Sequence, residues 1–242
     1  MVQCSVLDVE RFISEMKNPA KLLRGCGIFL KEDPRDLAYI VARKIILERP
    51  DSVYHIVAGA KILLLVWNIV YIRFLPAKTR RGLEEDLMKA YENARGDIGL
   101  LGDKRLESID LHDSNVADKI QAIFRCFQKY KSIGVTGASK TLHLIRPDLF
   151  VMWDGEIRKN YHKLHQNKLD TFDQCYVEFL KQTQEIAKGL LHLRSADEIW
   201  KMHPIHSIEP QLVEIFARAS VKSLLKMIDE CNYVRFKLGQ DF

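Results

Sequence analysis

The sequence predicts an all-α fold for this chain of 242 residues. Apolar residues recur at spacings of three and four, for example at Val116, Ile120, Ile123 and Phe127, which is the period of an amphipathic helix. We find no convincing set of alternating apolar and polar segments and no hairpin signal such as Asn-Gly between β-branched runs. We therefore expect a compact all-α unit over residues 1–242, built of two helical lobes.

Start and stop signals place five helices in the first part of the chain. Asn18-Pro19 separates the first two, and the turn from Gly25 to Gly27 is predicted to end the second. Asp33-Pro34 starts a long helix, because an aspartate cap followed by proline suits the first helical turn. The expected helices cover residues 9–16, 20–24, 33–50, 52–75 and 82–94, and a loop through Gly96, Gly99 and Gly102 follows the last of them.

The second part continues with helices separated by turns. A helix over residues 115–130 leads into a glycine turn, and the next helix is expected to begin at Ala138. Residues 202–210 hold two prolines and two histidines and are predicted to be irregular, and the tail over residues 233–242 is expected to be disordered or to close over a cleft. The remaining helices are expected over residues 170–190, from Ser195 to residue 200, and over residues 210–231.

The overall charge favours an anionic partner. The net charge is +5 and the pI is about 8.9, which attracts nucleic acid without being specific for it. Lys78, Arg80 and Arg81 precede the expected helix over residues 82–94, where the helix macrodipole does not favour cations. This basic run indicates either an anionic partner or a solvated loop.

Cysteine usage and hydropathy point to an intracellular protein, either cytoplasmic or nucleoid-associated. The five cysteines are odd in number and include no Cys-x-x-Cys pair, so we expect neither a disulfide framework nor a metal centre. The N-terminal stretch carries Asp8, Glu10 and Arg11, where a secretory signal needs an apolar segment. The longest apolar run covers residues 62–72, whereas a membrane-spanning helix needs about 20 residues, so we expect no membrane partner.

The most informative stretch is IGVTGASKTLHLIRPDLFVMWDGEIRKNY, which begins at Ile133. Its two glycines are expected to bracket a tight turn, and the amides at the start of the following helix point outward and suit a phosphate. Such a turn between two helices would bind a nucleic-acid backbone without reading its sequence. The expected backbone-binding residues are Lys131, Gly134, Val135, Gly137 and Ser139.

Residues 129–161 resemble the helix-hairpin-helix segment of the base-excision DNA glycosylase superfamily. In that family a glycine hairpin leads into a helix, then a loop, then an aspartate that begins another helix, and Asp154 in FVMWDGEIRK matches this aspartate. Lys140 in GASKTLH matches the lysine of the members that also cleave the strand. The hairpin is one residue longer than the family's and lacks its proline, and the interval from Lys140 to Asp154 is short for the family.

The resemblance implies an enzyme of DNA repair that excises a damaged base, with 8-oxoguanine as one candidate, from double-stranded DNA. Asp154 would stabilise the positive charge that develops on the sugar as the glycosidic bond breaks. Lys140 would be the amine that forms a Schiff base in an AP-lyase step. No cofactor is implied. Alternatively, Asp154 is only a helix cap and Lys140 is surface or a phosphate clamp.

Two other classes of protein stay open from the sequence. One is a non-catalytic helix-hairpin-helix module that binds nucleic acid, and the other is a helical regulatory or interaction protein. The pairs His162/His165 and His203/His206 have a spacing that occurs in zinc sites, but they lie on different segments, so we expect no metal. The oligomeric state is not indicated by the sequence.

Overall fold

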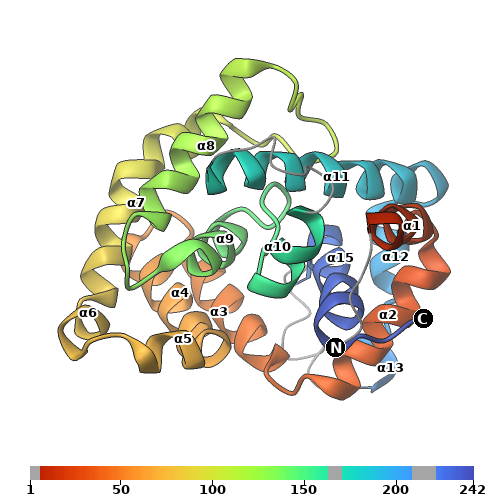
Figure 1. The fold of residues 1–242 in the computed structure, drawn as a ribbon, viewed down its shortest axis with the longest axis horizontal. Coiled ribbons are helices and arrows are strands. Elements are labelled where there is room, and N and C mark those ends of the chain that lie inside the picture. The colour runs from red at the N-terminus through yellow and green to blue at the C-terminus, as the bar shows by residue number, and fades with distance from the viewer. Residues whose placement is uncertain (1–5, 163–170, 209–221) are drawn as a thin grey trace. The chain divides into compact units, whose positions relative to one another are not determined.

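The computed structural model describes residues 6–162, 171–208 and 222–242. Every regular element in these ranges is a helix, which confirms the all-α prediction (Figure 1). The chain divides into two compact units. We call Arg35–Trp153 the central unit, and Met1–Pro34 together with Asp154–Phe242 the terminal unit. None of the helices described here has the length and apolar character that crossing a membrane requires.

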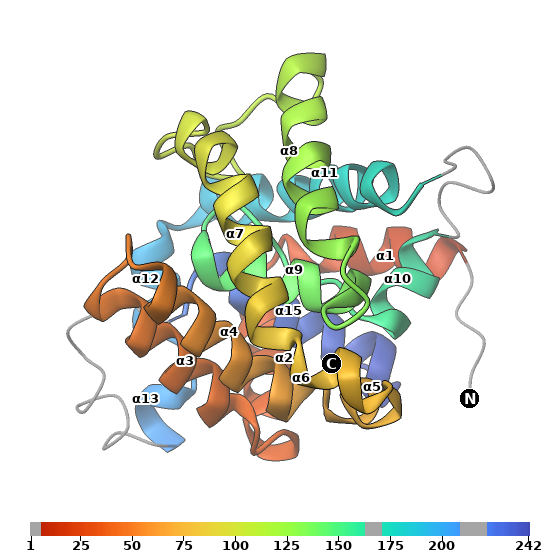
Figure 2. The same cartoon turned by 90° about the vertical axis from the view of Figure 1, so that its left-hand side faces the viewer.

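The central unit is organised around α4, which packs against α3, α7 and α9. A Cβ atom at Gly59 of α4 would lie 2.7 Å from the carbonyl oxygen of Ala42 on α3, so the close approach of these helices requires glycine. Helix α8 lies beside α7 and also contacts α9 (Figure 2). The helices of this unit are α3 (Asp36–Glu48), α4 (Val53–Trp67), α5 (Ile69–Phe74), α6 (Ala77–Arg81), α7 (Leu83–Leu100), α8 (Ser114–Gln128) and α9 (Gly134–Ile145).

The terminal unit joins the two ends of the chain, because α2 packs along α15. At their crossing a Cβ atom on Gly25 would lie 2.6 Å from Cys231 Sγ, so the contact is close. Helix α1 packs against α11, and α10 packs against the π-helical turn η1. The elements are α1 (Val6–Met16), α2 (Pro19–Glu32), α10 (Gly155–His162), α11 (Phe172–Leu193), α12 (Ala196–Lys201), α13 (Ile205–Ile208), α15 (Leu224–Tyr233) and η1 (Val234–Leu238).

The expectation that glycines end helices is wrong in two places in these units. Helix α2 continues through Gly25 and Gly27 to Glu32, and α7 continues through Gly96 and Gly99. A glycine inside a helix costs only about 1 kcal/mol relative to alanine, which tertiary packing easily outweighs.

Other boundaries also differ from the expected ones. The single helix expected over residues 52–75 is two helices, α4 and α5, which meet at Asn68. Helix α3 begins at Asp36 because Asp33 still belongs to the end of α2, where its N–H donates to the carbonyl of Phe29. Residues 205–208 of the segment expected to be irregular form α13. Most of the helix expected over 210–231 lies outside the described residues, and α15 covers its last part.

The C-terminal tail is ordered as part of the terminal unit, so the expectation of disorder is wrong. Residues 234–238 form η1, and Gly239 follows with a φ of +70°, in the left-handed region that favours glycine. The Phe242 ring lies 6.5 Å from the Phe12 ring on α1, centroid to centroid.

Candidate functional site

The turn before α9 is shorter than the sequence suggested. Gly134 is already the first residue of α9, and its φ of +65° lies in the region that favours glycine. A Cβ atom there would lie 3.0 Å from the Tyr71 hydroxyl. Gly137 lies inside the first turns of α9, so the expectation that two glycines bracket a turn ahead of the helix, which would then begin at Ala138, is wrong.

The start of α9 keeps the features expected of a phosphate contact. Its N-cap, Ile133, offers no side-chain hydrogen bond to the amides of the first turn. Lys131 is exposed, and Gly134 and Val135 are half-buried. Uncapped amides at a helix start beside a cation suit an anion. Contact of these three residues with a nucleic-acid backbone stays a prediction.

Ser139 has a different position from these three. It is fully buried, its hydroxyl donates to the carbonyl of Thr136 over 3.0 Å, and it accepts the N–H of Trp153 over 2.9 Å. Gly137 is also buried and lies against Leu64 and Asn68. Ser139 therefore fastens the segment that ends in Trp153 onto α9, and its hydroxyl is already used within the protein.

The Lys140 ammonium is held at the end of α4. It donates to Asn68 Oδ1 over 2.8 Å and to the carbonyl of Trp67 over 3.4 Å, and the residue is 6% exposed. Its Nζ also lies 5.4 Å from the centre of the Trp67 ring. A cation at the C-terminal end of a helix, over an aromatic face, is electrostatically favoured. Lys140 thus has a clear role in the packing of the central unit.

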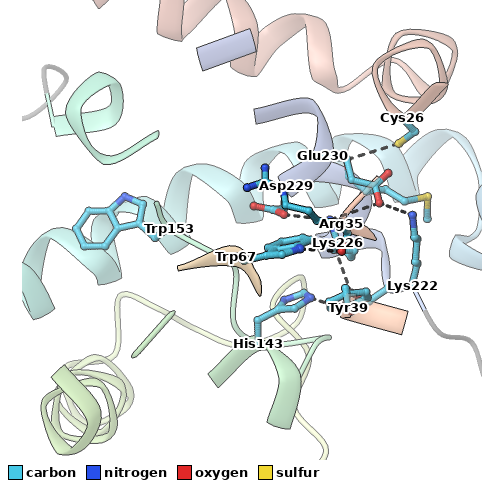
Figure 3. A network of polar contacts seen from close by, with 12 residues as sticks. Cys26, Arg35, Tyr39, Trp67, His143, Trp153, Lys222, Lys226, Asp229 and Glu230 are labelled. Atoms are coloured by element: carbon cyan, nitrogen blue, oxygen red, sulfur yellow. Dashed lines mark hydrogen bonds and ion pairs between the residues drawn. The ribbon is translucent and has the colours of Figure 1, made fainter. Parts of the chain in front are cut away.

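His143, three residues after Lys140 on α9, is a core residue. Its Nδ1 lies 2.7 Å from the carbonyl oxygen of Phe150, so this nitrogen carries the proton, and Nε2 accepts from the Tyr39 hydroxyl over 3.0 Å (Figure 3). The ring is fully buried. Both nitrogens are therefore engaged by the fold.

Asp154 begins the terminal unit and caps α10. Its Oδ1 accepts the N–H groups of Glu156 and Ile157 over 3.0 and 3.1 Å. Its Oδ2 lies 3.6 Å from Lys237 Nζ, and the side chain is 13% exposed. One oxygen is therefore fixed by the backbone while the other faces a cation. Lys140 belongs to the central unit and Asp154 to the terminal unit, so each is described with its own unit.

Sequence reasoning missed a buried group of charges in the terminal unit, which we call the Glu230 cluster. Its charged members are Lys222, Lys226, Asp229 and Glu230, which Figure 3 labels, and the His203 ring adjoins them with Nε2 3.3 Å from Glu230 Oε2. Glu230 Oε1 lies 2.7 Å from Lys222 Nζ and 3.4 Å from Lys226 Nζ, and these three side chains are fully buried. The two lysines hold the pKa of Glu230 well below its usual range, against the effect of burial.

Helical spacing could have revealed part of this cluster. Lys226 and Glu230 are four residues apart on α15, a spacing that brings side chains together. The residues around them, Leu224, Leu225, Met227 and Ile228, are apolar and buried. A helix that is apolar on all sides is buried, and any charges on it must be paired.

Cys26, His203 and Glu230 approach one another closely enough to be considered as metal ligands, since their donor atoms lie within 4.8 Å of each other. His203 Nδ1 accepts the N–H of Ile205, so the proton is on Nε2, which donates to Glu230. A metal on Nε2 would force that proton onto Nδ1, against the Ile205 N–H. The bonding therefore favours an ionic cluster.

The histidine pairs do not form the zinc site considered from the sequence. The His206 ring lies beside Trp200 with Nε2 near its carbonyl oxygen, and does not join His203 at Glu230. The side chains of His162 and His165 lie outside the described residues.

Asp229 is a second buried carboxylate of the terminal unit with a shifted pKa. Burial raises its pKa from 3.8 to about 6, although the ammonium of Lys226, 3.2 Å from Oδ2, opposes this shift. The negative charges of Asp154 and Glu230 contribute further in the raising direction. Asp229 therefore exchanges its proton close to neutral pH.

Comparison of the chain with protein-family models, with curated proteins and with solved structures finds no match.

Proposed function

We propose that this protein is a DNA glycosylase of the helix-hairpin-helix superfamily that excises a damaged base, with 8-oxoguanine in double-stranded DNA as the first candidate substrate. The observation that supports this most is the 2.9 Å hydrogen bond from the Trp153 N–H to Ser139 Oγ. Ser139 directly precedes Lys140, and Trp153 directly precedes Asp154. The bond holds Trp153, the last residue of the central unit, on α9 beside the residue that precedes Lys140, within the stretch that resembles the family.

Asp154 is the candidate catalytic carboxylate. Breaking the glycosidic bond leaves positive charge on the sugar, and a carboxylate fixed beside it stabilises that charge. Two amides of α10 fix Oδ1, so Oδ2 is presented without reorganisation during the reaction. The base must leave the helical stack to be reached, which is the general requirement for enzymes that act on bases.

Lys140 is the candidate amine for an AP-lyase step. In that step the neutral amine attacks C1′, the C1′–Nζ bond forms as the glycosidic bond breaks, and the departing base keeps the bonding electron pair and takes up a proton that the amine releases. The C1′–O4′ bond then opens, O4′ takes up the second proton of the amine, and the Schiff base forms. The contacts of Lys140 with Asn68 Oδ1 and the Trp67 carbonyl favour the ammonium form, which is not nucleophilic. The lyase step therefore requires Lys140 to leave both oxygens, whereas base release needs only Asp154.

The test uses labelled duplexes that contain 8-oxoguanine, uracil, hypoxanthine or an abasic site. Asp154→Asn keeps the capping oxygen but removes the charge, so it should bind the duplex with unchanged affinity and lose base release at least about 100-fold. Glu156→Gln removes a charge two residues away, paired with Lys159 at the surface, and should leave release unchanged. Equal release by Asp154→Asn and the wild type would refute the role of the carboxylate.

Borohydride trapping examines the lyase step separately. A covalent adduct that forms with the wild type and is lost in Lys140→Arg, which keeps the positive charge, would assign the nucleophile. Base release without an adduct would leave a glycosylase that lacks lyase activity.

A second candidate function is non-catalytic binding of a nucleic-acid backbone. It is favoured by the bonding of Lys140 and Asp154, since both already have roles in packing and capping. Salt-dependent duplex binding without release of any base, unchanged in Lys140→Arg and Asp154→Asn, would support it. Absence of salt-dependent binding would instead support a helical regulatory or interaction protein.

A further inference from the structure

The central unit carries an exposed apolar and basic surface on two short helices. Phe74 is 85% exposed and Val70, one helical turn earlier on α5, is 66% exposed. Four basic residues, all exposed, accompany them. The α5–α6 surface, as we call it, consists of Val70, Tyr71, Arg73, Phe74, Lys78, Arg80 and Arg81.

The positive charge of this surface is not neutralised by the protein. Residues 69–82 contain four cations and no acidic residue. Among the described residues, neither Arg73 nor any of the three cations of α6 has an ion pair.

The nearest acidic residues in the sequence are already bound elsewhere. Glu84, at the start of α7, pairs with Lys61 on α4 over 2.6 Å. Glu85 pairs with Lys89 over 2.6 Å, and Asp86 accepts the hydroxyl of Ser132. These three carboxylates are therefore not paired with the cations of the α5–α6 surface.

Tyr71 attaches this surface to the turn before α9. Its hydroxyl donates to the carbonyl of Lys131 over 2.6 Å, and its ring lies against Gly134. The exposed Lys131 side chain and the uncapped start of α9 are therefore next to α5. Lys131, the start of α9 and the helix that carries the exposed Phe74 are therefore neighbours in the central unit.

We propose that the α5–α6 surface binds single-stranded nucleic acid, with phosphates on its arginines and lysine and an unstacked base on the Phe74 ring. Cations that follow the backbone, combined with an aromatic side chain on which a base stacks, form the general arrangement for binding single strands. An anionic membrane also attracts basic residues, but two strongly exposed apolar side chains give it little area to insert. The adjoining α9 amides favour phosphate oxygens of a strand.

This inference goes beyond the proposed glycosylase, because it requires neither Asp154 nor release of a base. Binding and base release are measured separately, so one can fail while the other stands. If the protein releases a base and the α5–α6 variants bind single strands normally, the proposed glycosylase function stands and this inference is overturned. If binding depends on the α5–α6 surface and no base is released, this inference stands and the proposed glycosylase function is overturned.

The first experiment measures binding of a labelled 20-nucleotide thymidine oligonucleotide by fluorescence anisotropy at several salt concentrations. Arg80→Gln/Arg81→Gln should weaken binding and reduce the slope of log Kd against log salt by about 1.4, which corresponds to two lost phosphate contacts. Arg49→Gln/Arg95→Gln is the matched control, since it removes two exposed arginines without ion pairs at distant positions of the same unit. The control should leave both values unchanged.

The second experiment tests stacking on Phe74. Phe74→Ala should raise Kd for the oligonucleotide roughly 5- to 150-fold, the range for loss of one base–aromatic contact. It should have little effect on a strand of the same length without bases. Tyr54→Ala is the control, because Tyr54 is a 75% exposed aromatic residue elsewhere in the central unit.

Several results would overturn the inference. In the first, Phe74→Ala weakens binding of the strands with and without bases equally. In the second, Arg80→Gln/Arg81→Gln leaves the salt slope unchanged, and in the third the control variants lose as much affinity as the test variants. Binding to vesicles of anionic phospholipid that depends on Phe74, with no binding of the oligonucleotide, would identify a lipid surface in place of a strand.

Discussion

Replacing Glu230 by glutamine should destabilise the terminal unit by about 3–5 kcal/mol, because it removes the counter-charge of the buried Lys222 ammonium and one of the two carboxylates beside Lys226, which keeps only Asp229. With an effective dielectric constant of about 20, the contacts to Lys222 at 2.7 Å and Lys226 at 3.4 Å correspond to attractions of about 6 and about 5 kcal/mol. Desolvation of the carboxylate offsets a large part of this attraction, which leaves the smaller net cost.

Glu15 provides a matched comparison on α1. It also pairs with two cations, Arg11 at 2.8 Å and Lys21 at 3.1 Å, but its side chain is 29% exposed. Glu15→Gln should therefore cost at most about 1 kcal/mol. The two variants remove the same charge from the same kind of site, so burial is the main difference between them.

Urea unfolding at pH 7, followed by far-UV circular dichroism, measures both variants against the wild type. In thermal unfolding the Glu230 loss should lower Tm by roughly 6–20 °C, and the Glu15 loss by only a few degrees. If Glu230→Gln is no more destabilising than Glu15→Gln, the bonding assigned to the cluster is incorrect. Adding Lys222→Met to Glu230→Gln should recover part of the loss, since one unpaired cation is then removed.

Three further predictions concern the terminal unit and α9. Between pH 3.8 and 6 Asp229 keeps a proton in the folded protein that it releases in the unfolded chain, so the free energy of unfolding falls by up to about 3 kcal/mol as pH rises. Urea unfolding over pH 4–7 should show this decrease in the wild type but not in Asp229→Asn. Gly134→Ala places a Cβ at positive φ and 3.0 Å from Tyr71, and should cost at least about 1 kcal/mol in the same assay, whereas no loss would contradict the left-handed geometry. Asp154→Ala should cost about 1 kcal/mol through loss of the α10 cap, and Asp154→Asn much less; equal losses would exclude capping as the cause.

Helical periodicity was sufficient to predict the fold class, because the local spacing of apolar residues shows that a segment is a helix and which side of it is buried. The extent of α8 and the cap of α12 at Ser195 follow from such local signals. Glycine was the main source of error, since its effect on a helix depends on what it faces. Gly25 lies where a Cβ atom would meet Cys231, and this contact between α2 and α15 cannot be read from the local sequence.

The candidate site was predicted only in part, for a similar reason. The stretch from Gly134 to Asp154 is local, so the sequence could indicate a helix start and a capping aspartate. The partners of Lys140 come from α4, more than seventy residues earlier, and those of Glu230 include His203. Such pairings arise from tertiary packing and leave no short-range pattern.

Most of the unusual residues in this stretch are accounted for by the fold. Ser139 fastens the segment before Asp154, His143 bonds to Phe150 and Tyr39, and Lys140 caps α4. Asp154 is different, because asparagine satisfies a helix cap as well as aspartate does. The contact of Oδ2 with the partly exposed Lys237, at 3.6 Å, contributes at most about 1 kcal/mol.

The fold alone therefore does not require a carboxylate at position 154. If capping were its whole role, Asp154→Asn would leave every activity of the protein unchanged. A loss of base release in this variant, with stability and duplex affinity retained, would isolate the function of the negative charge. The comparison of aspartate with asparagine at this one position separates a catalytic group from a structural one more cleanly than any substitution of Lys140, whose removal also disturbs the end of α4.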